Sequence, residues 1–89
     1  MIPRNETRAF MEHIDIVPAT WADRLMKLAE EIHEYKKSRT KEEAAKELAD
    51  ISIVADTIRE KAYQLMESMG LDPVATVRSK MKEVVDRGR

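Results

Sequence analysis

The segment Glu30-Glu31-Ile32-His33-Glu34 is followed, after a short polar stretch, by a second acidic segment, Glu47-Leu48-Ala49-Asp50. If both segments are helical, each carries carboxylates three residues apart, which project from one side of its helix. The turn expected between them, Ser38-Arg39-Thr40, is short enough to force the two helices antiparallel. We therefore expect a helical hairpin with acidic groups on both of its helices.

The spacing of these acids sets their heights along the hairpin. Glu31 and Glu47 stand equally far in sequence from Arg39, so they should lie level with each other. Glu34 and Asp50 lie about 5 Å from that level, at a helical rise near 1.5 Å per residue. Carboxylates that converge between two helices repel one another unless a cation lies among them. Such oxygen ligands suit a hard divalent ion, so we predict a Mg²⁺ site, at which Mn²⁺ could substitute, with Glu31, Glu34, Glu47 and Asp50 as ligands.

The apolar pattern places one of these acids on a predicted core face. The first long helix has the stripe Trp21, Leu25, Leu28, Ile32 and Tyr35, and the second has Ala44, Leu48, Ile51, Ala55, Ile58, Ala62, Leu65 and Met69. Glu47 falls inside the second stripe, and Asp50 lies at its margin. A charge on a core face is costly unless it is paired or bound to a metal. A salt bridge would explain any single acid, whereas a metal better explains the set.

Composition limits the classes of function. The chain has 89 residues, 37% of them charged, with a formal net charge of −1. This balance gives no global attraction to nucleic acid or to anionic membranes, and we expect neither as a partner. The absence of cysteine excludes disulfides and cysteine-ligated zinc, and agrees with the cytoplasm, where we expect the protein. We expect no membrane span and no signal peptide.

Local signals divide the chain into helices. Asn5 could cap a short helix that ends near residues 11–13, and residues 13–18 form a connector. Thr20 with Asp23, and Thr40 with Glu43, predict the starts of two longer helices, the second through a capping box. These helices should span Trp21–Lys37 and Lys41–Met69.

The end of the chain predicts one more helix. Gly70 supplies a left-handed stop, and Asp72-Pro73 starts the last helix. Its apolar stripe contains Val74, Val77, Met81, Val84 and Val85.

We therefore predict an all-α fold, an antiparallel helical hairpin with short flanking helices. It forms a single domain over residues 1–89, with an N-terminal helix and connector at 1–19 and a core at 20–87. The last helix is too short to cover both stripes of the hairpin, and so small a chain buries a limited core alone. We expect self-association, as a dimer or a tetramer, to complete a four-helix-bundle core.

The acidic segments, together with Met69-Gly70-Leu71-Asp72-Pro73 and the cations Lys80 and Arg87, resemble the MazG-type all-α nucleoside triphosphate pyrophosphohydrolases over residues 20–87. The resemblance implies Mg²⁺-dependent hydrolysis of the α–β phosphate linkage of a nucleotide, releasing a monophosphate and pyrophosphate. It implies the same four metal ligands, with Glu30 and Glu34 as catalytic acids that support or orient the attacking water. Lys80 and Arg87 would contact phosphate. Val84 stands where the family often has asparagine.

Other readings remain open. Phosphoribosyl-ATP pyrophosphohydrolase has a similar helical architecture. The spacing of Glu30 and His33 is that of a carboxylate-bridged di-iron ligand pair, although both residues point away from the apolar stripe. A helical interaction module without catalysis would use the acids only as a solvated face, and it would leave Glu47 unexplained.

Overall fold

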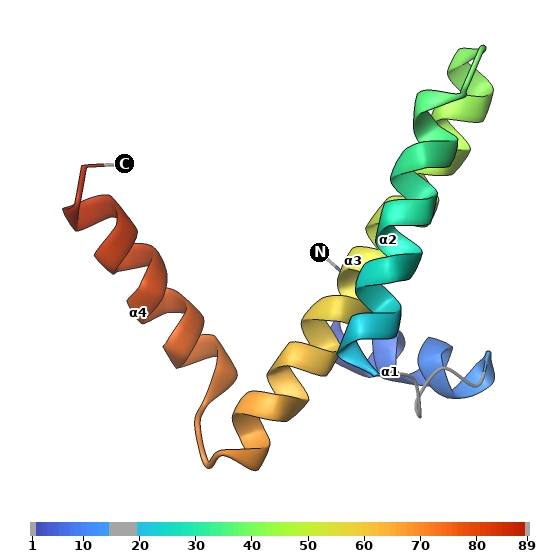
Figure 1. Cartoon of the computed structure of the whole chain (residues 1–89). Helices are drawn as coiled ribbons and strands as arrows, with labels where there is room; N and C mark the ends of the chain where they lie inside the picture. Colours follow the sequence, from blue (N-terminus) through green and yellow to red (C-terminus); the bar gives the residue numbers. More distant parts are fainter. Residues whose placement is uncertain (1, 15–19, 89) are drawn as a thin grey trace.

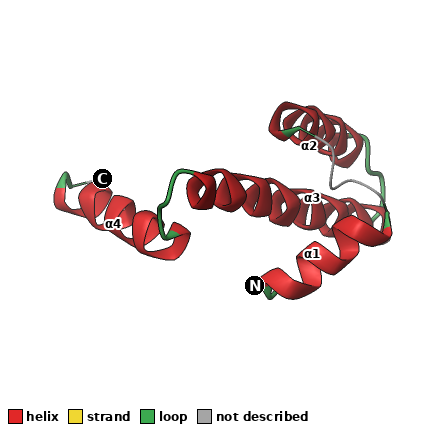
Figure 2. Ribbon diagram, turned by 90° about the horizontal axis from the view of Figure 1, so that it is seen from below, coloured by secondary structure: helices red, strands yellow, loops and turns green. Residues whose placement is uncertain are grey.

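The computed structural model describes residues 2–14 and 20–88, and within them the chain forms four helices and no strand. In chain order these are α1 (Arg4–His13), α2 (Trp21–Lys36), α3 (Lys41–Ser68) and α4 (Pro73–Asp86). The chain reverses direction between α2 and α3, which lie side by side, while α1 lies across α3 (Figures 1 and 2). The predicted all-α class is confirmed.

The first turns of α2 and α4 are each capped by the side chain of the residue that precedes the helix. Thr20 Oγ1 accepts a hydrogen bond from the Asp23 amide at 3.1 Å, and the Asp23 carboxylate accepts one from the Thr20 amide at 3.0 Å. This is a complete capping box. Asp72 caps α4 through the Ala75 amide at 3.1 Å, and Pro73 occupies the first helical position, as predicted.

The start of α3 differs from the prediction in one bond. Thr40 Oγ1 accepts from the Glu43 amide at 3.1 Å, but the Glu43 carboxylate accepts from the Arg39 amide at 2.9 Å. The reciprocal bond of a capping box is thus displaced by one residue toward the turn. The prediction of a full capping box was therefore wrong in this detail, although the helix begins where it was expected.

The two ends of the chain give one correction and one confirmation. The predicted cap at Asn5 was wrong, because α1 already begins at Arg4 and no side chain caps it. Of the predicted connector, residues 15–18 lie outside the described residues, and His13 is the last residue of α1. Gly70 has φ +79° and ends α3 as predicted. The Leu71 amide donates to the Met66 carbonyl and the Gly70 amide to the Glu67 carbonyl, each at 3.0 Å, which is a Schellman motif.

The buried part of the molecule is small and largely polar. Among the described residues the buried apolar side chains are Met11, Val54 and Pro73, whereas the buried polar and charged ones are Thr7, Arg24, Thr57 and Glu60. The predicted core stripe of α3 was wrong in part, because Leu48, Ala55, Leu65 and Met69 are exposed. The buried face of α3 is instead the one that holds Val54, Thr57 and Glu60.

Arg4 holds α1 on α3. Its guanidinium donates to both carboxylate oxygens of Glu60, at 2.7 and 2.9 Å, and to both oxygens of Glu67, at 3.2 and 3.0 Å. Gln64 donates to Glu60 at 3.1 Å, and Arg4 lies 5.0 Å from the centre of the Tyr63 ring. The Glu60 side chain is only 1% exposed, so these bonds compensate the burial of its charge.

The chain is open in shape. Among the described helices α4 contacts only α3, and it diverges from the pair of α2 and α3 as the second arm of a V (Figure 1). The radius of gyration is 15.2 Å, against roughly 12 Å for a compact domain of this length. No helix within the described part of the chain has the length and apolar character needed to span a membrane.

Candidate metal centre

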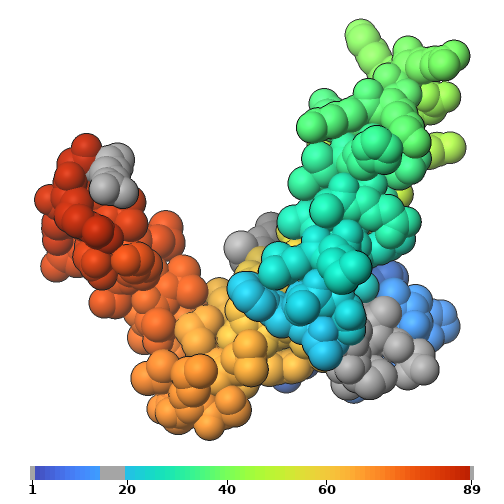
Figure 3. Space-filling model, in the orientation of Figure 1, coloured from blue at the N-terminus to red at the C-terminus, as the bar shows by residue number. Residues whose placement is uncertain are grey.

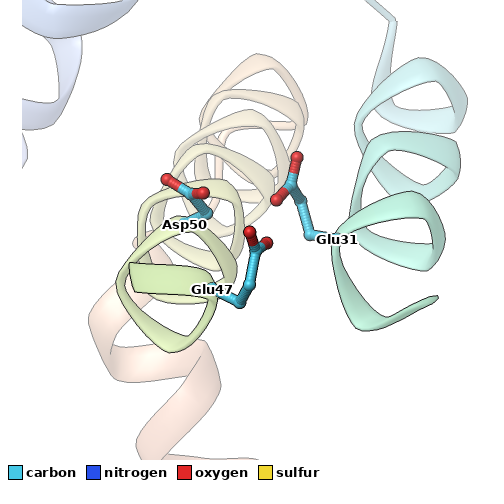
Figure 4. A group of neighbouring side chains, drawn as sticks. All are labelled: Glu31, Glu47 and Asp50. Carbon is cyan, nitrogen blue, oxygen red and sulfur yellow. The ribbon is translucent and has the colours of Figure 1, made fainter. Parts of the chain in front are cut away.

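Three carboxylates meet where α2 and α3 face each other. Glu31 projects from α2 toward Glu47 and Asp50 on α3 (Figure 4), and one oxygen from each lies within 4.8 Å of the others. The Glu31 side chain is 12% exposed, Glu47 is half-buried and Asp50 is exposed. The group, which we call the acidic trio, is therefore accessible from one side and enclosed by helices on the other.

The electrostatics of the acidic trio favour a cation. Partial burial raises the pKa of Glu47, and the charges of Asp50, Glu31 and Glu34 and a hydrogen bond with Glu31 raise this pKa further. Lys27 lies one turn before Glu31 on α2, and its Nζ is 3.1 Å from the Glu31 carboxylate. The hydrogen bond to Glu31 and the charges of Glu30 and Glu31 raise the pKa of Lys27 against the effect of desolvation. One ammonium group thus offsets part of the negative charge.

The donor set of the acidic trio fits the predicted ion. All three groups offer carboxylate oxygens, and the trio contains neither nitrogen nor sulfur donors. Such ligands suit Mg²⁺, Mn²⁺ and Ca²⁺ rather than zinc or copper. Three ligands leave coordination positions for water or for phosphate oxygens, which Mg²⁺ keeps in most of its protein sites.

The remaining predicted acids lie outside the acidic trio. Glu34 lies near Lys37, with 3.9 Å between its carboxylate and the Lys37 ammonium, and Glu30 lies 3.5 Å from Lys27 Nζ. Because α2 and α3 are antiparallel, Glu34 lies closer to the turn than Glu31 does, whereas Asp50 lies farther from the turn than Glu47 does. Glu34 and Asp50 should therefore be separated by about 9 Å along the axis, although each lies within a few residues of the level of Glu31. Glu34 as a metal ligand and both acids as catalytic groups stay predictions.

The predicted phosphate contacts lie on the other arm of the molecule. Lys80 and Arg87 both approach Glu83 on α4, with nitrogen–oxygen distances of 3.3 and 3.0 Å. Because α4 diverges from α2 and α3 (Figure 3), one chain does not bring these cations to the acidic trio. His33 is exposed and is not a member of the trio.

A cavity beside the acidic trio was missed in the sequence. It has a volume of about 360 Å³ and lies between α1, α2 and α3, and its lining residues include Phe10, Arg24, Lys27, Glu31 and Asp50. Arg24 is 9% exposed, and its Nε donates to Thr57 Oγ1 at 3.0 Å. The sequence did indicate that Arg24 could be buried, because this residue stands between Trp21 and Leu28 on the apolar stripe of α2.

Comparison of the chain with protein-family models, with curated proteins and with solved structures finds no match.

Proposed function

We propose that this chain is a Mg²⁺-dependent nucleoside triphosphate pyrophosphohydrolase, which cleaves the α–β phosphate linkage to give a monophosphate and pyrophosphate. The observation that carries the proposal is the acidic trio, in which two helices bring Glu31, Glu47 and Asp50 within 4.8 Å of one another. The resemblance of the acidic segments and of the residues around Gly70 to the MazG-type enzymes supports the choice of substrate.

Charge explains why a metal and a phosphate substrate belong together here. A triphosphate is polyanionic, so bare carboxylates would repel it. Mg²⁺ held by the acidic trio would neutralise phosphate charge and polarise a phosphoryl oxygen. Glu30 and Glu34 lie within a turn of Glu31 and are exposed, so a water molecule can reach either carboxylate. One of them accepts the proton of the attacking water, whose oxygen bonds to phosphorus while the bridging oxygen leaves with the departing phosphate group.

Lys80 and Arg87 enter this proposal through a second copy of the chain. Lys80 lies on α4 and Arg87 directly follows it, and the apolar residues Met81 and Val85 of this helix are 63% and 69% exposed. Packing this face against another copy would bury it, and could bring the two cations toward the partner's acidic trio. There they would contact phosphate oxygens by charge-assisted hydrogen bonds.

The test is a panel of nucleoside triphosphates, with phosphoribosyl-ATP included, assayed with Mg²⁺, with Mn²⁺ and with a chelator. Release of pyrophosphate rather than orthophosphate, lost on chelation, is the expected result. Glu47→Gln should abolish it. Glu42→Gln, which removes one exposed carboxylate from the first turn of α3, serves as the matched control. Orthophosphate as the first product, or equal activity in both variants, would contradict the proposal.

A helical interaction module is the second candidate. The ion pair of Lys27 with Glu31 at 3.1 Å favours it, because that pair balances part of the acidic charge without a metal. The exposed apolar side chains of α3 and α4 favour it as well. Under this candidate the wild-type chain would self-associate, hydrolyse no member of the panel, and bind Mg²⁺ no better than Glu47→Gln.

A further inference from the structure

Arg24 is a buried cation without an acidic partner. Its residue is 9% exposed, and its one hydrogen bond in the described part of the chain runs from Nε to the neutral hydroxyl of Thr57. Thr57 in turn is fully buried and donates to the Val54 carbonyl at 2.7 Å. Across residues 2–14 and 20–88 no carboxylate lies within ion-pair distance of the Arg24 guanidinium. Charged side chains this deeply placed are normally paired. The two terminal nitrogens of Arg24 have no hydrogen-bond partner among the described residues and reach solvent, so they can donate to an anion.

Arg24 also lines the cavity between α1, α2 and α3. Lys27, the other cation that lines this cavity, is already paired with Glu31. The guanidinium is therefore the cationic group of the cavity that has no acidic partner. It is a planar fork of donors, whose shape matches two oxygens of a phosphate.

We propose that this cavity binds the phosphate chain of the nucleotide, with Arg24 donating to phosphate oxygens. The assignment of a nucleotide rests on the proposed function, whereas anion binding at Arg24 rests on the geometry alone. Asp50 would repel a bare anion, so binding should be stronger when Mg²⁺ is present. Phe10, Ile14 and Ile53 also line the cavity, and this apolar wall suits the nucleoside part of the ligand.

Calorimetric titration with inorganic pyrophosphate, in the presence of Mg²⁺, tests the role of Arg24 without any turnover. Arg24→Met should raise the Kd for pyrophosphate by about 30-fold or more, since a charged hydrogen-bond partner is lost. Arg78→Met removes the same charge from an exposed position on α4 and should leave this Kd unchanged within about threefold. Wild-type affinity in Arg24→Met would overturn the proposal.

Thermal unfolding separates ligand binding from a structural role. Without ligand, Arg24→Met should unfold at the same temperature as the wild type or higher, because it removes a largely buried cation that has no acidic partner in the described part of the chain. A lower unfolding temperature would mean that Arg24 serves to bridge α2 and α3, and would overturn the proposal. In the wild type, the Arg24 side-chain NMR signal, assigned with the Arg24→Lys variant, should shift on addition of pyrophosphate. A constant signal would also overturn it.

Two further comparisons separate this proposal from the proposed function. A nucleoside triphosphate with a methylene bridge between its α- and β-phosphorus atoms should bind more tightly than pyrophosphate if the apolar wall holds the nucleoside. Equal affinity for the two ligands would overturn the assignment of the nucleoside to this wall. Pyrophosphate binding through Arg24, without hydrolysis of any nucleotide, would uphold the cavity and refute the enzyme. Hydrolysis with an unchanged KM in Arg24→Met would uphold the enzyme and refute the cavity.

Discussion

Arg4→Met should destabilise the protein by leaving the buried carboxylate of Glu60 without its cation. Glu60 is 1% exposed and receives two hydrogen bonds from Arg4, at 2.7 and 2.9 Å. Removing one partner of a buried ion pair typically costs about 3–5 kcal/mol. Arg4 itself is 27% exposed, and Gln64 continues to donate to Glu60, so we expect the lower end of this range, about 3 kcal/mol at neutral pH.

The same variant should reverse the pH dependence that Glu60 contributes. Burial acts to raise the pKa of Glu60, but the hydrogen bonds and charge of Arg4 outweigh it and lower this pKa below 4.5. In the wild type this group therefore stabilises the fold above about pH 4.5, and its contribution is lost as the pH falls through the lowered value. Without Arg4 the pKa rises above its unfolded value. Protonation then favours the folded state, and stability falls as the pH rises through the raised value.

Urea unfolding at one protein concentration, at neutral pH and near pH 4, measures both effects. Arg8→Met is the matched control, because Arg8 lies on the same helix and acts on Glu60 through its charge alone, and its one hydrogen bond to a described residue reaches a backbone carbonyl at 3.5 Å. Replacing both partners, as Arg4→Met with Glu60→Met, should recover most of the lost stability, because no buried charge then remains unpaired. The reasoning fails if Arg4→Met costs no more than Arg8→Met, or if the double variant is less stable than Arg4→Met alone.

Three further predictions concern the metal centre and the assembly. Glu47→Gln should reduce Mg²⁺ binding and turnover by more than about 100-fold. It should also make the metal-free protein more stable above the raised pKa of Glu47, because the repulsion among the carboxylates of the acidic trio falls. Calorimetry measures the binding and urea unfolding without metal measures the stability, and a less stable variant would contradict the prediction. His33→Ala should leave Mg²⁺ affinity and activity unchanged, and a large loss of metal binding would favour the di-iron alternative. The wild type should be at least a dimer by light scattering, and Met69→Asp should weaken the dimer, since Met69 is 70% exposed; a cooperatively folded wild-type monomer at micromolar concentration would count against this.

The helices could be predicted because their boundaries are set locally. The bond from the Asp23 amide to Thr20, the cap at Asp72 and the positive φ of Gly70 each involve residues within a few positions of one another. The start of α1 is different, because Arg4 is held by Glu60 and Glu67, which follow it by 56 and 63 residues. Local capping rules carry no information about such distant partners.

The core could be predicted less well, because hydrophobic periodicity assumes that charged residues face water. In α3 the buried face holds Thr57 and Glu60, and in α2 it holds Arg24. Each of these side chains has a polar partner on another helix: Arg24 of α2 donates to Thr57 of α3, and Arg4 of α1 donates to Glu60 of α3. The apolar residues that the periodic pattern assigned to the core, such as Leu65, are left exposed because α1 and α2 cover a different face of α3.

The acidic trio and the exposed apolar surface are connected through the length of α3. Its N-terminal half pairs with α2 and carries Glu47 and Asp50, and α2 covers less than the full length of α3 (Figure 1). Near the end of α3, Leu65 and Met69 are 49% and 70% exposed, and this part of the chain leads into α4, whose cations lie away from the acids. A second copy packed on this surface would bury the apolar residues and supply phosphate contacts to the trio. Stability and catalysis would then depend on the same contact, so a variant that weakens association should lose both.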